Sequence, residues 1–100
     1  MGRQPMSGSE CNLVRKHIVV RGRVHAVGYR AWCLRIGRSM RLRGWVRNLD
    51  DGRVEVVLEG ERDAVERAVP MITGGPPLAA VRDFAVTEEA VSGEEAFHVR

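Results

Sequence analysis

The chain has 100 residues, of which 44% are hydrophobic and 29% charged, and 16 basic against 13 acidic residues give a formal charge of +3. This length predicts one domain with a single core, and the composition excludes a disordered chain. The uncharged apolar runs are too short to span a membrane, and the mild positive charge favours anionic partners without selecting one.

Residues 1–14 are predicted to form a flexible polar tail ahead of a domain over residues 15–100. They lack the apolar segment of a signal peptide. The two cysteines, Cys11 and Cys33, are too few for the disulfide framework of a small secreted domain. Neither has the spacing of a zinc site, so we expect a reduced, cytoplasmic protein with no structural metal.

The first half of the domain begins with a predicted strand over residues 16–22, where Ile18 and Val20 share one face. A loop over residues 22–28 follows, with a glycine at each end. A helix is predicted over residues 29–40, because its apolar residues recur at i, i+4 spacing. These residues are Trp32, Cys33, Ile36, Gly37 and Met40.

Two further strands are predicted over residues 42–48 and 53–59. The Asp-Gly pair between them is a strong hairpin signal. Val54, Val56 and Leu58 alternate with Glu55, Val57 and Glu59, which predicts one covered and one wet face.

A second helix is predicted over residues 61–72, with an irregular last turn because Pro70 lies inside the pattern. Its apolar stripe consists of Ala64, Val65, Ala68, Val69 and Ile72. After a glycine- and proline-rich break at 73–77, strands are predicted over residues 81–88 and 96–99, with a turn near residues 92–93.

The order of elements is therefore βαββαβ with a short final strand. Two right-handed βαβ units joined by a hairpin predict an α+β, ferredoxin-like sandwich, in which both helices cover one face of a four-stranded antiparallel sheet. This fold hosts many functions, so it does not by itself select one.

The first motif that could take part in a reaction is the strand end, loop and helix start over residues 22–30. A short loop that enters a helix presents backbone N–H groups without intrahelical partners, which suits an oxyanion. Arg30 would lie in the first helical turn, where its planar guanidinium matches two phosphate oxygens. The alternative is a tight turn followed by a surface arginine.

The second motif covers residues 44–54, in which Asn48 ends a strand just before the hairpin turn. The amide oxygen of Asn48 could orient a water molecule for attack. Alternatively, the side chain caps the turn, as asparagine often does.

Together the two motifs resemble the paired signatures of the acylphosphatase family, and the resemblance extends from about Lys16 to the C-terminus. The second signature is met in full by Gly44, Trp45, Val46, Arg47, Asn48, Gly52, Val54 and Gly60. The first is met at Gly22, Val24, Val27, Tyr29 and Arg30. His25 and Ala26 depart from it, since the family usually has glutamine and glycine there, and Arg41 replaces a common helix-stop glycine.

The resemblance implies hydrolysis of acyl phosphates, with Arg30 binding the phosphate and Asn48 positioning the water. It also implies that a cradle of backbone N–H groups, from His25, Ala26, Val27, Gly28, Tyr29 and Arg30, holds the phosphate. No cofactor or metal is expected. The expected partners are a small acyl phosphate and its product, inorganic phosphate, with neither nucleic acid nor membrane, and the expected state is a monomer.

Other readings remain open on the sequence alone. The domain could bind anions without turnover, particularly if Ala26 strains the cradle loop, or it could be an RNA-binding module on the same fold. RNA recognition needs aromatic residues on the central strands, where Trp45 is the obvious candidate. His17 and His98 are predicted to be structural or on the surface, whereas His25 contributes either its backbone N–H or its side chain. The identity of the acyl group is not encoded in a recognisable pattern.

Overall fold

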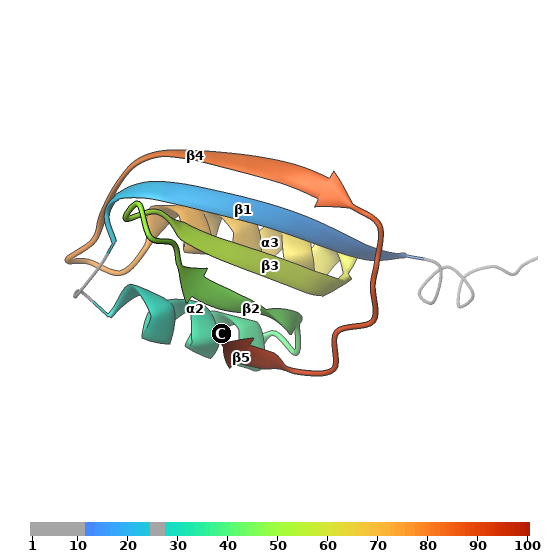
Figure 1. The fold of residues 1–100 in the computed structure, drawn as a ribbon. Coiled ribbons are helices and arrows are strands. Elements are labelled where there is room, and N and C mark those ends of the chain that lie inside the picture. The colour runs from blue at the N-terminus through green and yellow to red at the C-terminus, as the bar shows by residue number, and fades with distance from the viewer. Residues whose placement is uncertain (1–11, 25–27) are drawn as a thin grey trace, which may run out of the picture.

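The computed structural model describes residues 12–24 and 28–100 (Figure 1). The predicted helices and strands are confirmed within a few residues. They are β1 (Leu13–Arg23), α2 (Tyr29–Ser39), β2 (Arg43–Asn48), β3 (Val54–Glu61), α3 (Arg62–Gly74), β4 (Ala80–Glu89) and β5 (Phe97–Val99). Leu13 and Val14, which the sequence pattern placed in the tail, are the first residues of β1, and Val14 is buried there.

The sheet has the strand order β4-β1-β3-β2-β5. The pairs β1–β3, β1–β4 and β2–β3 are antiparallel, as predicted. The short strand β5 differs, because it pairs parallel to β2. β1 and β2 are both antiparallel to β3, so they run in the same direction, and β4 runs opposite to both. Because the chain reverses its direction after β4, β5 runs parallel to β2 at the far edge.

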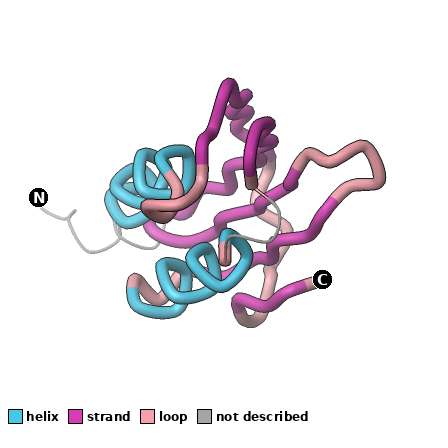
Figure 2. The backbone as a smooth tube through the Cα atoms, turned by 90° about the vertical axis from the view of Figure 1, so that its left-hand side faces the viewer, coloured by secondary structure: helices cyan, strands magenta, loops and turns pink. Residues whose placement is uncertain are grey.

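Both helices cover one face of this sheet and lie side by side (Figure 2). The core between the layers is built from the alternating β-branched residues of the central strands, among them Ile18, Val20, Val54 and Val56, none of which is measurably exposed. The helices contribute the predicted stripes, with Cys33 and Ile36 buried on α2 and Val65, Ala68 and Ile72 on α3.

Pro70 does not disturb α3 as the sequence predicted, because the helix continues through it to Gly74. Pro70 is exposed, so the carbonyl group that loses its N–H partner can be solvated. The Thr73 hydroxyl donates to the Val69 carbonyl (3.0 Å), which adds a hydrogen bond within the last turn.

The other face of the sheet is less wet than its alternating pattern predicted. Val57 is fully buried and Glu59 is only 1% exposed. Val57 lies between His17 and Trp45 on the neighbouring strands, and the ring of Trp45 is itself covered by the guanidinium groups of Arg47 and Arg100.

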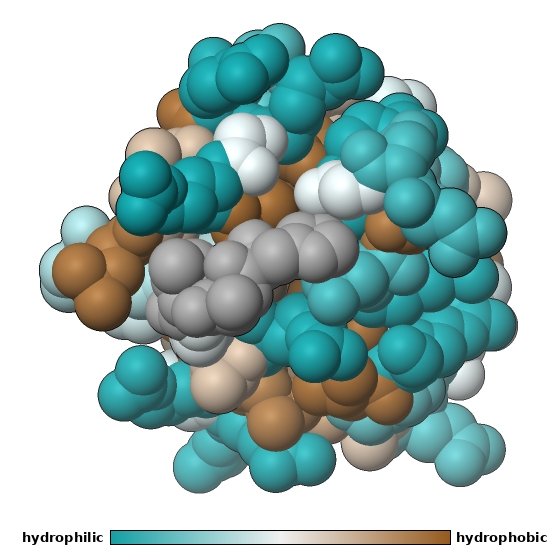
Figure 3. All heavy atoms as spheres, turned by 60° about the vertical axis from the view of Figure 1, so that its left-hand side comes forward, coloured by the Kyte–Doolittle hydropathy of each residue, from teal (hydrophilic) through white to brown (hydrophobic). Residues whose placement is uncertain are grey.

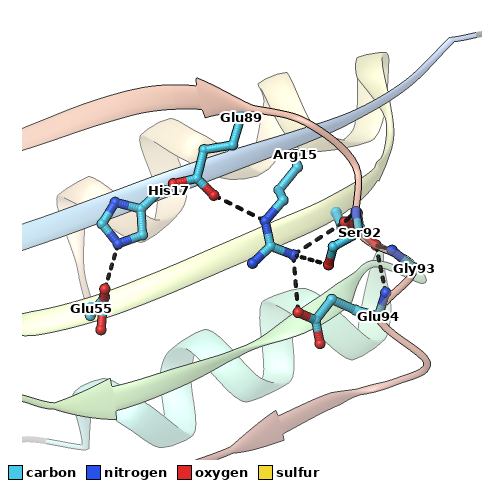
Figure 4. A network of polar contacts seen from close by, with 8 residues as sticks. Arg15, His17, Glu55, Glu89, Ser92, Gly93 and Glu94 are labelled. Carbon is cyan, nitrogen blue, oxygen red and sulfur yellow. Dashed lines mark hydrogen bonds and ion pairs between the residues drawn. The ribbon is translucent and has the colours of Figure 1, made fainter.

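The buried carboxylate of Glu59 holds the connection between β4 and β5 against the sheet. It accepts backbone N–H bonds from Ser92 (2.7 Å), Gly93 (3.0 Å) and Glu94 (2.7 Å). Arg15 donates to it (3.2 Å) and also binds Glu89 and Glu94 (both 3.0 Å) (Figure 4). These contacts place β5 beside β2, because they fix the segment that leads into it.

Glu59 should therefore make stability depend on pH. Burial opposes its ionisation, but the N–H groups of residues 92–94 and Arg15 outweigh burial and hold its pKa below the usual range. A carboxyl whose pKa is lowered on folding stabilises the native state above its unfolded pKa of about 4.3. This contribution is lost as the pH falls through the lower folded value.

We predict that Glu59→Gln lowers the free energy of unfolding at pH 7 by about 2–3 kcal/mol, because an amide N–H would face backbone donors. The difference from wild type should shrink as the pH falls below the unfolded-state pKa of about 4.3 toward the lower native value. Urea unfolding at pH 7 and pH 3 measures both values. The exposed Glu66→Gln is the matched control, expected within about 0.5 kcal/mol of wild type, and an equal loss in both variants would contradict the prediction.

Arg41 ends α2 in a conformation that usually selects glycine. Its φ is 58°, in the left-handed region. The Leu42 N–H donates to the Gly37 carbonyl (2.8 Å) and the Arg41 N–H to the Arg38 carbonyl (3.1 Å), which is the hydrogen-bond pattern of a Schellman motif. Arg41, which replaces the common helix-stop glycine, therefore adopts the left-handed backbone conformation that glycine would adopt there.

We predict that Arg41→Gly raises the free energy of unfolding by roughly 0.5–1 kcal/mol. Glycine adopts the left-handed conformation without strain, which stabilises the folded state. This gain should exceed the loss caused by the greater conformational entropy of glycine in the unfolded chain. Thermal or urea unfolding measures the change. Arg67→Gly, inside α3, is the control and should destabilise by about 1 kcal/mol; a loss of stability in Arg41→Gly would show that Arg41 is not strained.

Candidate active site

The connection between β1 and α2 leads into a helix start that lacks a side-chain cap. His25, Ala26 and Val27 lie outside the described residues. Gly28 is the N-cap residue, and its carbonyl accepts the helical hydrogen bond from the Trp32 N–H (2.9 Å). The first turn has no acidic residue, so its backbone N–H groups and the positive end of the helix dipole are available to an anion.

Glycine is favoured at position 28 by the backbone conformation, not by a lack of room for a side chain. Its φ is 78°, in the left-handed region, and a Cβ atom there would meet nothing within 4 Å. Glycine adopts this conformation without steric cost. Gly28 therefore starts α2 in a conformation that other residues rarely adopt.

Two aromatic donors anchor the start of α2 to the end of α3. The buried Tyr29 hydroxyl donates to the Ile72 carbonyl (2.6 Å), and the Trp32 indole N–H donates to the Met71 carbonyl (2.8 Å). The Ile72 carbonyl lies in the last turn of α3, where carbonyl groups lack intrahelical partners, so the Tyr29 bond satisfies an acceptor that α3 leaves open. The Met71 carbonyl also accepts the Gly75 N–H (3.1 Å), and Trp32 adds a second donor to it. This role was not predicted from the sequence, although a tyrosine and a tryptophan in one helical turn are a usable signal for such donors.

Arg30 lies on the solvent side of the same turn. Its neighbour Tyr29 is directed into the core, and Arg30 itself is exposed. It makes no hydrogen bond or ion pair with another described residue, so its guanidinium is free to bind an anion near the helix start.

Asn48 is the last residue of β2 and is also exposed. Its side chain makes no hydrogen bond within residues 12–24 and 28–100. The turn that follows is closed by other groups, since the Leu49 N–H donates to the Arg53 carbonyl (2.8 Å) and the Arg53 N–H donates to the Asp51 carboxylate (3.1 Å). Asn48 therefore does not cap the turn, and its amide is available.

The fold brings the two motifs to the same end of the sheet. Asn48 pairs with Val54, which pairs with Val20 shortly before β1 ends. Asn48 also shares a face with the core residue Val46, two positions earlier, so it lies on the side that the helices cover. The start of α2 lies at this end as well (Figure 1).

The histidines in the described residues lie elsewhere. His17 contacts the Glu55 carboxylate (2.5 Å) and alternates with the core residues Ile18 and Val20, which places it on the opposite face of the sheet (Figure 4). His98 lies in β5 at the sheet edge and is exposed. Both placements agree with the structural or surface roles expected from the sequence.

Cys33 is no nucleophile at neutral pH. It is fully buried, and burial raises the pKa of its thiol to about 12. The pKa of Tyr29 is raised too, mainly by burial and further by Cys33. Within the described ranges, no three His, Cys, Asp or Glu side chains are grouped so that they could hold a metal ion.

The structure thus defines an α+β sandwich with an arginine at a helix start and an asparagine at a neighbouring strand end, neither of which has a partner within the described residues, an arrangement suited to phosphoryl chemistry. The family model for acylphosphatase matches residues 16–99. An acylphosphatase of Trichormus variabilis is 46% identical over 96% of this chain and 95% of its own length. The chain therefore belongs to the acylphosphatase family of enzymes.

Solved structures agree with this assignment. A Coxiella burnetii acylphosphatase has a TM-score of 0.87 at 36% identity, covering 95% of this chain and all of that one. The Bacillus subtilis acylphosphatase has a TM-score of 0.83 at 36% identity, covering 87% of this chain and 98% of that one. The ferredoxin-like fold predicted from the order of elements is confirmed.

We predict that Tyr29→Phe lowers the free energy of unfolding by about 1–2 kcal/mol, because the buried Ile72 carbonyl would lose its hydrogen-bond donor. Trp32→Phe is the comparison, since its hydrogen bond is exposed and water can replace the lost donor. Urea unfolding of both variants measures the difference. Equal stability of Tyr29→Phe and wild type would show that this hydrogen bond does not anchor α2.

Proposed function

We propose that the chain hydrolyses acyl phosphates by direct attack of water on phosphorus, with Arg30 and Asn48 as its catalytic residues. The observation that carries the proposal is a pair of side chains without a partner in the described part of the chain, one at the uncapped start of α2 and one at the end of β2, at the same end of the sheet. Residues 25–27 complete the cradle in this proposal, on the strength of the sequence motif.

The chemistry demands little from the protein beyond position and charge. The water oxygen forms a bond to phosphorus while the bond from phosphorus to the acyl oxygen breaks. The carboxylate departs with the bonding electrons and needs no strong general acid. The water proton passes to a phosphate oxygen of the substrate, which accounts for a mechanism without a histidine base.

Each group has a separate task in this scheme. The Arg30 guanidinium and the N–H groups of the first turn of α2 bind the equatorial phosphate oxygens, whose charge is spread in a loose transition state. The Asn48 amide oxygen accepts a hydrogen bond from the attacking water and aligns it with the bond that breaks. Both residues come from one chain, so a monomer suffices.

RNA binding is disfavoured by the open face of the sheet. Trp45, the aromatic residue expected to stack on bases, is only 6% exposed, and its ring already stacks with Arg47 and Arg100. The substrate in this proposal is a small molecule handled in water. No helix in the described part of the chain is long and apolar enough to cross a bilayer, and a cytoplasmic location remains our expectation.

We predict that Arg30→Gln and Asn48→Ala each lower kcat for benzoyl phosphate by about a hundredfold or more, the usual effect of removing one group aimed at the transition state. Arg35→Gln is the matched control, because Arg35 is exposed on the same helix and contacts only the Trp32 ring among the described residues. Its kcat should stay within about twofold of wild type.

Circular dichroism and urea unfolding should show that the variants remain folded, since Arg30 and Asn48 are both exposed. A wild-type protein that binds phosphate without turnover would assign it the role of an anion-binding domain. Near-normal kcat in folded Arg30→Gln would remove Arg30 from the mechanism.

A further inference from the structure

A second feature at this end of the molecule is a surface depression of about 630 Å³. It is bounded by residues 21–23 at the end of β1, by the hairpin residues 51–53, and by Ala80 and Arg82 at the start of β4. Neither Arg30 nor Asn48 lines it. Figure 3 shows this end of the molecule, where hydrophilic residues predominate on the surface.

The charge in the depression is strongly one-sided. Its lining includes Arg21, Arg23, Arg53 and Arg82, against the single acid Asp51. Asp51 is already paired with Arg53 (2.7 Å). Arg21 lies 3.8 Å from Asp83, with both side chains exposed. A concave surface lined by one sign of charge focuses its field on counter-ions.

Arg23 and Arg82 are the two arginines of the lining without a partner among the described residues. Both are exposed. Within residues 12–24 and 28–100, no other group uses the donors of their guanidinium groups. Planar, charged donors of this kind bind carboxylate and phosphate oxygens in pairs.

The backbone places Arg82 here through a β-bulge. Arg21 pairs with Asp83, but the next residue, Gly22, pairs with Val81, so Arg82 is the extra residue on β4. Bulges redirect side chains and are frequent beside functional sites. A Cβ atom on Gly22 would lie 2.2 Å from the Ala80 carbonyl oxygen, so the close approach of the two strands requires glycine at this position.

The depression shares two connections with the candidate active site. β1 ends at Arg23, shortly before Gly28 in the chain, and the hairpin residues 51–53 follow Asn48 at the end of β2. An anion bound in the depression would therefore contact segments that adjoin both catalytic residues in the chain.

We propose that this depression is a second oxyanion site, in which Arg23 and Arg82 bind a carboxylate or phosphate group. The oxyanion has two possible sources. It belongs either to the acyl part of a substrate whose reacting phosphate is held near Arg30, which rests on the proposed function, or to a separate small anion. The first source makes the enzyme selective for acyl phosphates that carry an additional negative charge.

The site itself is tested by NMR titration of the full-length, isotope-labelled protein with inorganic phosphate. Two groups of amide signals should shift in wild type, one at residues 28–31 and one at residues 22–23, 52 and 80–82. In Arg82→Ser the second group should bind about tenfold more weakly, the loss expected for one charge-assisted hydrogen bond. The first group should be unchanged.

Arg67→Ser is the control for net charge, because it removes one exposed arginine from α3 and should leave both groups of shifts unaltered. Arg30→Gln should weaken only the first group, so this titration separates failure of the catalytic site from failure of the second site. Absence of shifts at residues 22–23 and 80–82 in wild type, or equal weakening by Arg82→Ser and Arg67→Ser, would overturn the proposal.

The source of the oxyanion is decided by kinetics with benzoyl phosphate and 4-carboxybenzoyl phosphate, which differ by one carboxylate. If the acyl part supplies the oxyanion, Arg82→Ser should raise KM for the carboxylated substrate by about tenfold and leave KM for benzoyl phosphate unchanged. Unchanged values for both substrates, with the second group of NMR shifts retained in wild type, assign the site to a separate anion.

Discussion

The hydrogen bond from the Tyr29 hydroxyl to the Ile72 carbonyl is the constraint on which the candidate site depends. It joins the first residue of α2 to the last turn of α3, across the core between the helices. Because Tyr29 is held inside, Arg30 is held outside, at the position where the uncapped N–H groups of the helix also lie. A packing interaction thereby determines the direction of the functional side chain.

The other end of α2 is held by the C-terminal strand. The Phe97 ring packs so closely on Gly37 that a Cβ atom there would lie 2.6 Å from it, and Arg38 donates to the Phe97 carbonyl. Phe97 reaches this position because the buried Glu59 carboxylate holds the preceding connection through three backbone N–H groups. Glu59 thus contributes to the position of α2 although it lies on the opposite face of the sheet.

Charged side chains on the open face of the sheet differ in their pairing from those at the end that carries the two motifs. The charged groups on the open face, such as Arg15 with Glu59 and His17 with Glu55, are paired with one another and stabilise the fold. At the end that carries the motifs, Arg30, Arg23 and Arg82 have no partner among the described residues. These arginines supply the donors that the two proposed anion sites require.

Local patterns determined much of this protein. Hydrophobic periodicity predicted each helix and strand, because it depends on neighbours within a few positions. Arg30 and Asn48 were selected because their two motifs together resemble the family signatures, since each motif alone also fits an ordinary turn. The tertiary structure alone decided the parallel pairing of β5, the burial of Glu59, the anchoring role of Tyr29 and the bulge at Arg82. Each of these joins residues that are more than 30 positions apart in the chain, and no local spacing encodes which distant backbone groups will meet.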